Sequence, residues 1–210
     1  VESLELVQQR LSESLDAYHS VDEFLEDLLD IQRRLHRDHL GLYADRLEEL
    51  ILKVRVFGFH FATMDIRQDS RIHTTVVSQL LTAAGYLEEG EYEKLDAAGR
   101  LSAVVDALNG VDGIRNAQPR LSEGIAWDTL ESLRSARTLQ QKNGLRGVHR
   151  YIISNTRSAA NVLEILLLSR VAVEEELVLD IVPLFETIND LEQVEEIMAT
   201  LLDHPIYSEH

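Results

Sequence analysis

Apolar side chains recur every three or four residues along the first quarter of the chain, which is the spacing of one face of an α-helix. The first such stripe predicts a helix from 4 to 18. A second helix begins at a capping box formed by Ser20 and Glu23, and Gly41 marks its expected end. A third helix is predicted from 43 to 56. The N-terminal part of the chain is therefore expected to be helical.

Three later segments replace the helical spacing with aromatic and β-branched residues, which favour strands. The first, from 56 to 66, is almost continuously apolar or small, as in a strand buried on both faces. The second covers 148 to 153 and the third 177 to 185. Strands that alternate with helices are typical of βα units that form a parallel sheet. The helices predicted around these strands cover 71–84 (capped by Asp69 or Ser70 and stopped by Gly85), 127–143, 158–171 and the residues from about 190 onward.

The segment between the first two strands, from 86 to 143, is acidic and predominantly helical. The dipeptides Asn109-Gly110 and Asp112-Gly113 predict turns within it. Three strands are too few to close an eight-stranded barrel. Either the remaining strands lie outside this chain, or the sheet is open.

Composition narrows the classes of partner. The chain has 20 Lys and Arg against 37 Asp and Glu, a formal net charge of −17, so a nucleic acid or an anionic membrane would repel it. The absence of Cys excludes disulfides, thiolate zinc sites and Cys nucleophiles, and fits a reducing cytoplasm. No apolar stretch approaches the roughly 20 residues of a membrane helix. Because the sequence starts at Val1 without Met, we interpret it as a piece of a longer chain.

The carboxyl ends of the predicted strands hold the candidate chemistry, because parallel β/α folds place their sites there. The three ends carry Asp65–Asp69, Ser154–Arg157 and Glu186-Thr187. The guanidinium of Arg67 offers a planar fork of donors suited to phosphate or carboxylate. The carboxylate of Glu186 suits Mg²⁺ or Mn²⁺. These residue types predict a metal-assisted site for a phosphorylated or carboxylated anion.

Plainer explanations exist for each of these residues. Arg67 lies between two Asp residues and could belong to a surface ion-pair cluster. Glu186 could simply be a carboxylate that a helix N-terminus favours. Ser154 and Asn155 are residue types that cap helices, and we expect them to cap the helix that follows.

Three blocks resemble the phosphoenolpyruvate carboxylase family. Met64–His73 resembles its Asp-Ile-Arg-Gln-Glu-Ser segment with a following His, and Tyr151–Ser154 resembles its Tyr-Val-Ile-Ser strand. Val182–Leu191 resembles its Pro-Leu-Phe-Glu-Thr-Leu-Asp-Asp-Leu segment. The blocks occur in the family's order within 57–207. The chain departs from the family at Asn155, where Met is common, and at 160–161, where Ser-Asp is common.

The resemblance implies a fold. The predicted fold class is mostly α with a small parallel β component, as a partial α/β (TIM-like) barrel with surrounding helices. We expect a helical segment over 1–56 and a partial β/α barrel region over 57–210, with a helical insertion at about 86–143.

The resemblance also implies an activity, in which phosphoenolpyruvate and bicarbonate give oxaloacetate and phosphate with the help of Mg²⁺ or Mn²⁺. Arg67 would bind the substrate and act in catalysis by stabilising developing charge, with Asp65 and Gln68 supporting substrate binding. Glu186 would be one ligand of the metal, and the second would lie outside the chain. We expect the full-length parent to be a cytoplasmic, allosteric homo-oligomer that fixes carbon dioxide for the tricarboxylic acid cycle, and the isolated chain to be inactive.

Two other functions stay open at this point. One is a different Mg-dependent barrel enzyme that acts on phosphoenolpyruvate-like anions. Such enzymes often place a Lys near the metal, and no Lys lies at a predicted strand end here. The other is an acidic helical interaction module, in which the charges at the strand ends are only surface ion pairs.

Overall fold

The computed structural model of the chain divides into two compact units, Val1–Thr63 with Gln141–Gly147, and Met64–Gln140 with Val148–His210. No helix among its described residues is long and apolar enough to cross a membrane. The residues that the structure describes are 2–12, 18–60, 62–121, 123–174 and 177–210.

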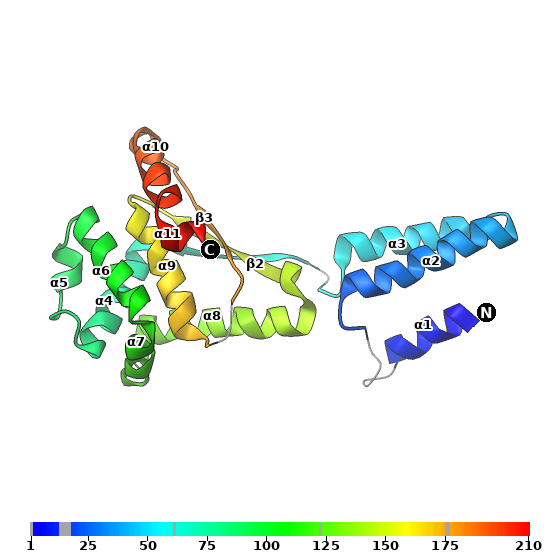
Figure 1. Cartoon of the computed structure of the whole chain (residues 1–210), viewed down its shortest axis with the longest axis horizontal. Coiled ribbons are helices and arrows are strands. Elements are labelled where there is room, and N and C mark those ends of the chain that lie inside the picture. The colour runs from blue at the N-terminus through cyan, green and yellow to red at the C-terminus, as the bar shows by residue number, and fades with distance from the viewer. Residues whose placement is uncertain (1, 13–17, 61, 122, 175–176) are drawn as a thin grey trace. The chain divides into compact units, whose positions relative to one another are not determined.

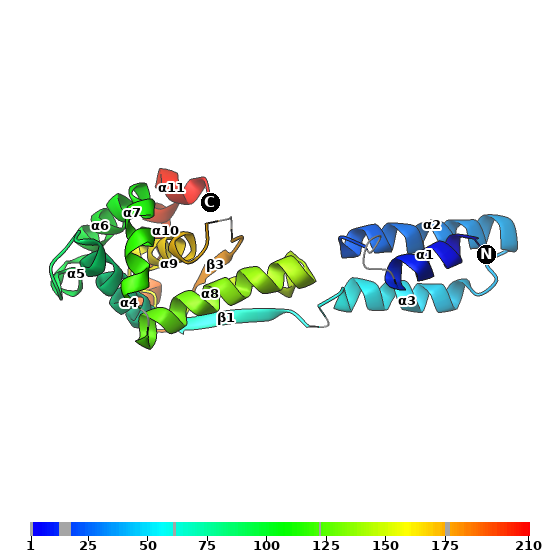
Figure 2. The same ribbon diagram turned by 90° about the horizontal axis from the view of Figure 1, so that it is seen from below.

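The first unit contains the N-terminal helices α1 (Glu2–Ser12), α2 (Val21–His39) and α3 (Ala44–Phe57), with α2 and α3 side by side (Figure 1, Figure 2). The three helices agree with the predicted ones, although 13–17 of the first lie outside the described residues. A small apolar core joins them, made of Val7, Phe24, Leu28, Ile31, Ile51 and Val54.

The start of α2 shows a capping arrangement that differs in one bond from the predicted box. The Glu23 backbone N–H donates to Ser20 Oγ at 3.1 Å, as expected of an N-cap. The Glu23 carboxylate accepts from the backbone N–H of His19 at 3.1 Å, one residue before the cap. The helix ends at His39, and its C-cap Leu40 adopts a left-handed conformation (φ 53°) directly before Gly41.

The second unit is built on a three-stranded sheet of β1 (Met64–Asp69), β2 (Val148–Ser154) and β3 (Asp180–Pro183). Both pairs of neighbours are parallel, and the order is β1-β2-β3. The prediction of a parallel sheet with alternating helices is therefore confirmed. In the described part of the chain this sheet is open, with β1 and β3 at its edges.

Two strand boundaries were predicted wrongly. The apolar run from 56 begins inside α3, which continues to Phe57 and ends at Gly58, a glycine with φ 52°. The strand starts only at Met64, and its side chains are exposed or half-buried instead of buried on both faces. The third strand is shorter than 177–185 for a related reason, since the apolar residues before Asp180 belong to the loop that leads to it.

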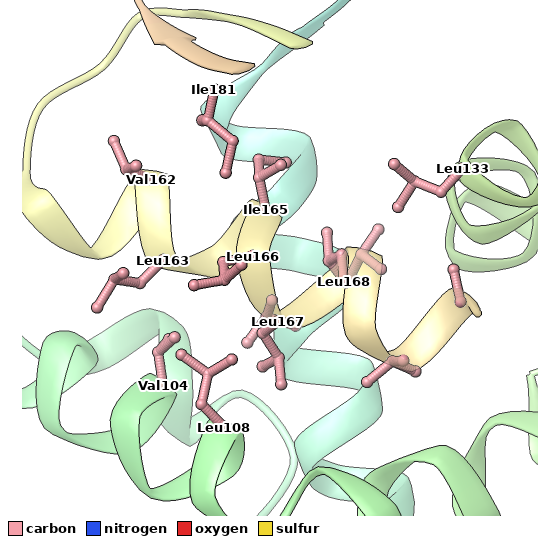
Figure 3. Packing of buried hydrophobic residues seen from close by; sticks show 14 of the residues in the cluster. Val104, Leu108, Leu133, Val162, Leu163, Ile165, Leu166, Leu167, Leu168 and Ile181 are labelled. Carbon is pink, nitrogen blue, oxygen red and sulfur yellow. The ribbon is translucent and has the colours of Figure 1, made fainter. Parts of the chain in front are cut away.

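Helix α9 (Ala159–Ala172) forms the centre of the core, between the sheet and α6 (Ala97–Asn109). Nearly every residue of α9 is buried. Ile165 points toward Ile181 of β3, while Leu163 lies on the side of Val104 and Leu108 of α6 (Figure 3). Each fully buried aliphatic side chain of this kind stabilises the fold by roughly 1.5–3 kcal/mol.

Helices α4 (Ser70–Ala84) and α7 (Val111–Ala117) also pack on α9 and lie beside each other (Figure 2). The cap of α4 at Asp69 and its stop at Gly85 confirm the prediction. The turn predicted at Asp112-Gly113 is wrong, because these residues lie inside α7 and only Gly110 forms the break. The other elements are α5 (Glu91–Lys94), η1 (Gln118–Arg120), α8 (Gly124–Asn143), η2 (Leu145–Gly147), α10 (Ile188–Leu202) and α11 (Pro205–Ser208).

Candidate functional site

The carboxyl ends of the three strands lie at one edge of the sheet. Asp69, the last residue of β1, is paired in register with Ser154, the last residue of β2. Beyond β3, the backbone N–H of Leu184 donates to the carbonyl of Ile153 at 2.9 Å and extends the pairing toward Glu186. The loops that follow the strands therefore meet at the same edge, which is where a site was predicted.

At this edge Arg67 of β1 and Glu186 of the loop after β3 form an ion pair, with Nη2 and Oε1 3.3 Å apart. The side chains remain 58% and 49% exposed, so both are accessible from solvent. The alternative that Arg67 pairs with the Asp residues beside it in sequence does not describe this arrangement. Its carboxylate partner comes from a segment 119 residues away.

The two Asp residues beside Arg67 are bound to other arginines. Asp65 lies 3.7 Å from Nη1 of Arg150 on the neighbouring strand. Asp69 caps α4 by accepting from the backbone N–H of Arg71 and binds the guanidinium of the same residue through both oxygens, at 2.9 and 2.8 Å. The bonds from Arg71 lower the pKa of Asp69 to about 2. Both carboxylates thus have arginine partners other than Arg67, which pairs with Glu186.

Gln68 takes a different position from Arg67, because successive side chains of a strand point to opposite faces. Its Oε1 accepts from the backbone N–H of Asp69 at 2.9 Å, and its side chain is half-buried. Among the described residues no side-chain hydrogen bond joins Gln68 to Arg67 or Glu186. The structure therefore brings Arg67 and Glu186 together but leaves Gln68 outside that pair.

The loop after β2 is held to the first residue of α4 by a hydrogen bond. Asn155 adopts a left-handed conformation (φ 59°), and its backbone carbonyl accepts from Ser70 Oγ at 2.6 Å. Its side-chain oxygen accepts from Nε of Arg157 at 3.0 Å. The prediction that Ser154 and Asn155 cap the next helix is wrong, because the capping box of α9 is formed by Ser158 and Asn161.

The loop after β3 leaves the carboxylate of Glu186 available. Thr187 is the N-cap of α10, and Asp190 completes the capping box, with Oδ2 accepting from the backbone N–H groups of Glu186 and Thr187 at 3.2 and 3.0 Å. These bonds lower the pKa of Asp190. The first turn of α10 is thus capped by Thr187 and Asp190, and Glu186 lies one residue before the N-cap.

The carboxylate of Glu186 fits the role of a single Mg²⁺ or Mn²⁺ ligand. Mg²⁺ usually takes one or two protein carboxylates and completes its shell with water and substrate oxygens. Within the described ranges there is no group of three His, Asp or Glu side chains that could hold a metal ion. Glu186 can therefore contribute one oxygen, and the other ligands would come from elsewhere.

One charged residue on this face of the sheet was not predicted as a site residue from the sequence. Arg150 stands opposite Asp65 in register, and its guanidinium is about half exposed. The signal was present, because Tyr151 and Ile153 are buried and alternation places Arg150 on the other face, with Arg67.

Comparison with known proteins agrees with the strand-end blocks. A family model described as phosphoenolpyruvate carboxylase matches residues 2–210. Three similar proteins, each named phosphoenolpyruvate carboxylase, come from Synechococcus sp., Azoarcus sp. and Rhodothermus marinus. Their identities to this chain are 32% over 197 residues, 34% over 200 and 33% over 205, covering 91%, 92% and 90% of it. The same alignments cover 18%, 22% and 22% of those proteins, so the chain spans about a fifth of their length.

Proposed function

The chain belongs to the phosphoenolpyruvate carboxylase family, and we propose that it serves an enzyme that converts phosphoenolpyruvate and bicarbonate to oxaloacetate and phosphate. The observation that carries this proposal is the Arg67–Glu186 pair at the carboxyl edge of the sheet. The two residues come from separate blocks that resemble the family, and they meet where a parallel β/α fold holds its chemistry.

Arg67 is proposed to bind phosphoenolpyruvate. A chain with a net charge of −17 needs local cations to hold a multiply charged anion, and the exposed guanidinium of Arg67 provides one at the sheet edge. A guanidinium offers paired donors to phosphate or carboxylate oxygens. Fixed donors of this kind also stabilise charge that develops during reaction. Arg67 is therefore proposed to act in catalysis as well as in binding.

Glu186 is proposed as one carboxylate ligand of Mg²⁺ or Mn²⁺. The chemistry that such an ion supplies when bound is polarisation of the enolate oxygen. The exposed carboxylate of Glu186 has only Arg67 as a described ion-pair partner. Release of that guanidinium to an incoming anion would leave Glu186 negatively charged beside the substrate, where a cation is favoured.

Asp65 and Gln68 are proposed to support substrate binding. Asp65 points to the same face as Arg67 and is tied to β2 by Arg150. Gln68 holds the backbone of Asp69 and thereby the turn from β1 into α4. Both roles are indirect, since Asp65 repels an anion and Gln68 bonds within its own strand.

The open sheet is proposed to be part of an eight-stranded α/β (TIM-like) barrel, with the face that carries Arg67, Asp65 and Arg150 inside. Parallel sheets are normally covered on both faces, yet these three side chains are between about 40% and 60% exposed. The relatives are about five times longer than this chain, so they have ample length for further strands. Because the barrel would be incomplete, the isolated chain is proposed to be inactive.

Other properties are proposed from the family alone. The full-length parent is proposed to be a cytoplasmic, allosteric homo-oligomer that fixes carbon dioxide and supplies oxaloacetate to the tricarboxylic acid cycle.

The test is an assay of the full-length parent with phosphoenolpyruvate, bicarbonate and MgCl₂. We expect equal amounts of oxaloacetate and phosphate, and no oxaloacetate when bicarbonate is left out. A parent that consumes phosphoenolpyruvate without forming oxaloacetate would support a different barrel enzyme instead. Measurable turnover by the 210-residue chain alone would contradict the proposal that it is inactive.

A further inference from the structure

The carboxyl group of Glu164 is enclosed in the apolar core of the second unit. Its side chain lies on α9 and has no exposed surface. Side chains from three helices surround it: Tyr92 of α5 donates to Oε1 at 2.8 Å, Asn161 of α9 donates to Oε2 at 3.1 Å, and Thr74 of α4 places Oγ1 3.0 Å from Oε1. Burial raises the pKa of Glu164 to about 7 in spite of these hydrogen bonds.

The hydroxyl of Thr74 gives the cluster two alternative hydrogen-bond patterns. Thr74 Oγ1 is 3.1 Å from the backbone carbonyl of Ser70 and within hydrogen-bond distance of Glu164, yet it carries one proton. Beside an ionised Glu164 that proton is drawn to the carboxylate. When Glu164 is protonated, Thr74 Oγ1 can accept a hydrogen bond from the carboxyl O–H and donate its own hydrogen bond to the carbonyl of Ser70. The two states therefore differ in whether the Ser70 carbonyl, in the first turn of α4, receives a hydrogen bond from Thr74.

The same carboxyl group reaches the edge of the sheet through Asn161. While Nδ2 of Asn161 donates to Glu164, its Oδ1 accepts from the backbone N–H groups of Arg157 and Ser158, at 3.1 and 3.3 Å. Asn161 therefore connects Glu164 to the loop Ser154–Ser158 and to its exposed cation, Arg157. From the other side, Ser70 Oγ holds the carbonyl of Asn155 in the same loop.

We propose that Glu164 is a positioning residue for the site: through Asn161 it sets the conformation of the loop Ser154–Ser158, according to whether its carboxyl group carries a proton. The relevance of this loop to catalysis rests on the proposed function, which places the substrate at this edge of the sheet. The ionised carboxylate bonds more strongly to Asn161 than the neutral acid does. The loop is therefore held more firmly when Glu164 is ionised.

Two neighbouring groups with shifted pKa values, Tyr92 and His73, do not change charge between pH 6 and 8. Burial and the neighbouring carboxylate raise the pKa of Tyr92, so it stays protonated. Arg100 of α6 favours the ionised carboxylate and binds the backbone carbonyls of α5. Glu93 of α5 accepts from Ser78 Oγ. His73 of α4 lies against Tyr151 instead, and burial lowers its pKa to about 4.

Hydrogen exchange read by mass spectrometry tests this proposal on the protein itself. In the wild type, protection of the Arg157 and Ser158 amides, corrected for the intrinsic rate, should rise about fivefold from pH 6 to pH 8. In Glu164→Gln it should not change with pH. The matched control Glu93→Gln removes a neighbouring carboxylate that does not contact Asn161, and should keep the wild-type response. A flat wild-type profile, or an unchanged response in Glu164→Gln, would overturn the proposal.

A second variant covers the case in which Glu164→Gln does not fold. Tyr92→Phe removes one donor to the carboxylate, so the midpoint of the loop response should move to higher pH. An unmoved midpoint would contradict the proposal. These readouts need no turnover, so they remain decisive if the proposed carboxylase activity fails. If the activity is present, the pH profile of KM for phosphoenolpyruvate should lose its step near pH 7 in Glu164→Gln, and an unaltered step would count against a link to the site.

Discussion

The Arg67 guanidinium and the Glu186 carboxylate lie 3.3 Å apart at the carboxyl edge of the sheet, although 119 residues separate them in the chain. Their meeting depends on the whole β1-β2-β3 order, because β1 and β3 are not neighbours. Both side chains are accessible, and both helix caps beside them are satisfied by other residues, Asp69 for α4 and Thr187 with Asp190 for α10. The pair is therefore free to exchange partners for an anion and a cation.

Replacement of Arg67 by Lys should keep the charge and remove the planar fork. We expect a rise in KM for phosphoenolpyruvate and a fall in kcat, together on the order of 100-fold in kcat/KM. Steady-state kinetics of the full-length parent measures both constants. Arg33→Lys is a suitable control, because Arg33 is an exposed arginine of α2 in a surface ion pair with Asp30. If Arg67→Lys keeps the wild-type KM and kcat, the planar guanidinium fork of Arg67 has no role.

Replacement of Glu186 by Gln should weaken the response to metal. The amide keeps the shape and loses the charge, so the Mg²⁺ or Mn²⁺ concentration for half-maximal turnover should rise about tenfold or more. A metal titration at saturating phosphoenolpyruvate gives this value. Glu195→Gln, an exposed position on α10, is the matched control. If both variants show the wild-type titration, Glu186 is not a ligand.

Glu164 should make the free energy of unfolding fall as pH rises. Its pKa is about 7 when folded and near the ordinary 4.5 when unfolded, so the folded state holds the proton more tightly. The stabilisation is fully present below pH 4.5 and is lost as pH rises through 7, with a total change of about 3 kcal/mol. Buried His73, whose folded pKa is about 4, changes stability in the opposite sense in both proteins, so urea unfolding between pH 5 and 8 should show the fall as the difference between the wild type and Glu164→Gln. Equal slopes would contradict the assignment.

Asp69 should make the free energy of unfolding rise with pH, the opposite of Glu164, and over a lower pH range. Its pKa is about 2 when folded against an ordinary 3.8, so its contribution is present above pH 3.8 and is lost as pH falls through 2. At pH 7, Asp69→Ala should destabilise the protein by about 1 kcal/mol through loss of the α4 cap. Asp69→Asn keeps a capping oxygen and should cost less. Chemical unfolding of the wild type and both variants at pH 7 and pH 2 checks this: the stability lost in Asp69→Ala should be smaller at pH 2, and an undiminished loss would contradict the assignment.

The strand ends could be predicted because they combine a local pattern with a topological rule. Alternation of strands with helices indicates a parallel sheet, and a parallel sheet brings its carboxyl ends to one edge. The two rules together predict that Arg67 and Glu186 lie at the same edge of the sheet. The sequence alone does not give their distance, because it depends on how the loop of Glu186 leaves β3.

Other features depend on packing that a linear pattern does not contain. The apolar residues near Phe57 satisfy a helical stripe as well as a strand, and in the structure α3 continues to Phe57. Glu164 interrupts an apolar helix without a signal of its own. Its partners Tyr92 and Thr74 lie 72 and 90 residues away, so its buried environment appears only after three helices have packed.

The most direct test of the account is a double-mutant cycle of Arg67→Ala and Glu186→Ala in the full-length parent, followed by oxaloacetate formation. If the two residues act on one reacting substrate, each single variant should lose on the order of 100-fold or more in kcat/KM. The double variant should then lose far less than the product of the two single losses, because groups that act as a unit are not additive. Near wild-type kcat/KM in either single variant, or losses that simply multiply, would contradict a shared site at Arg67 and Glu186.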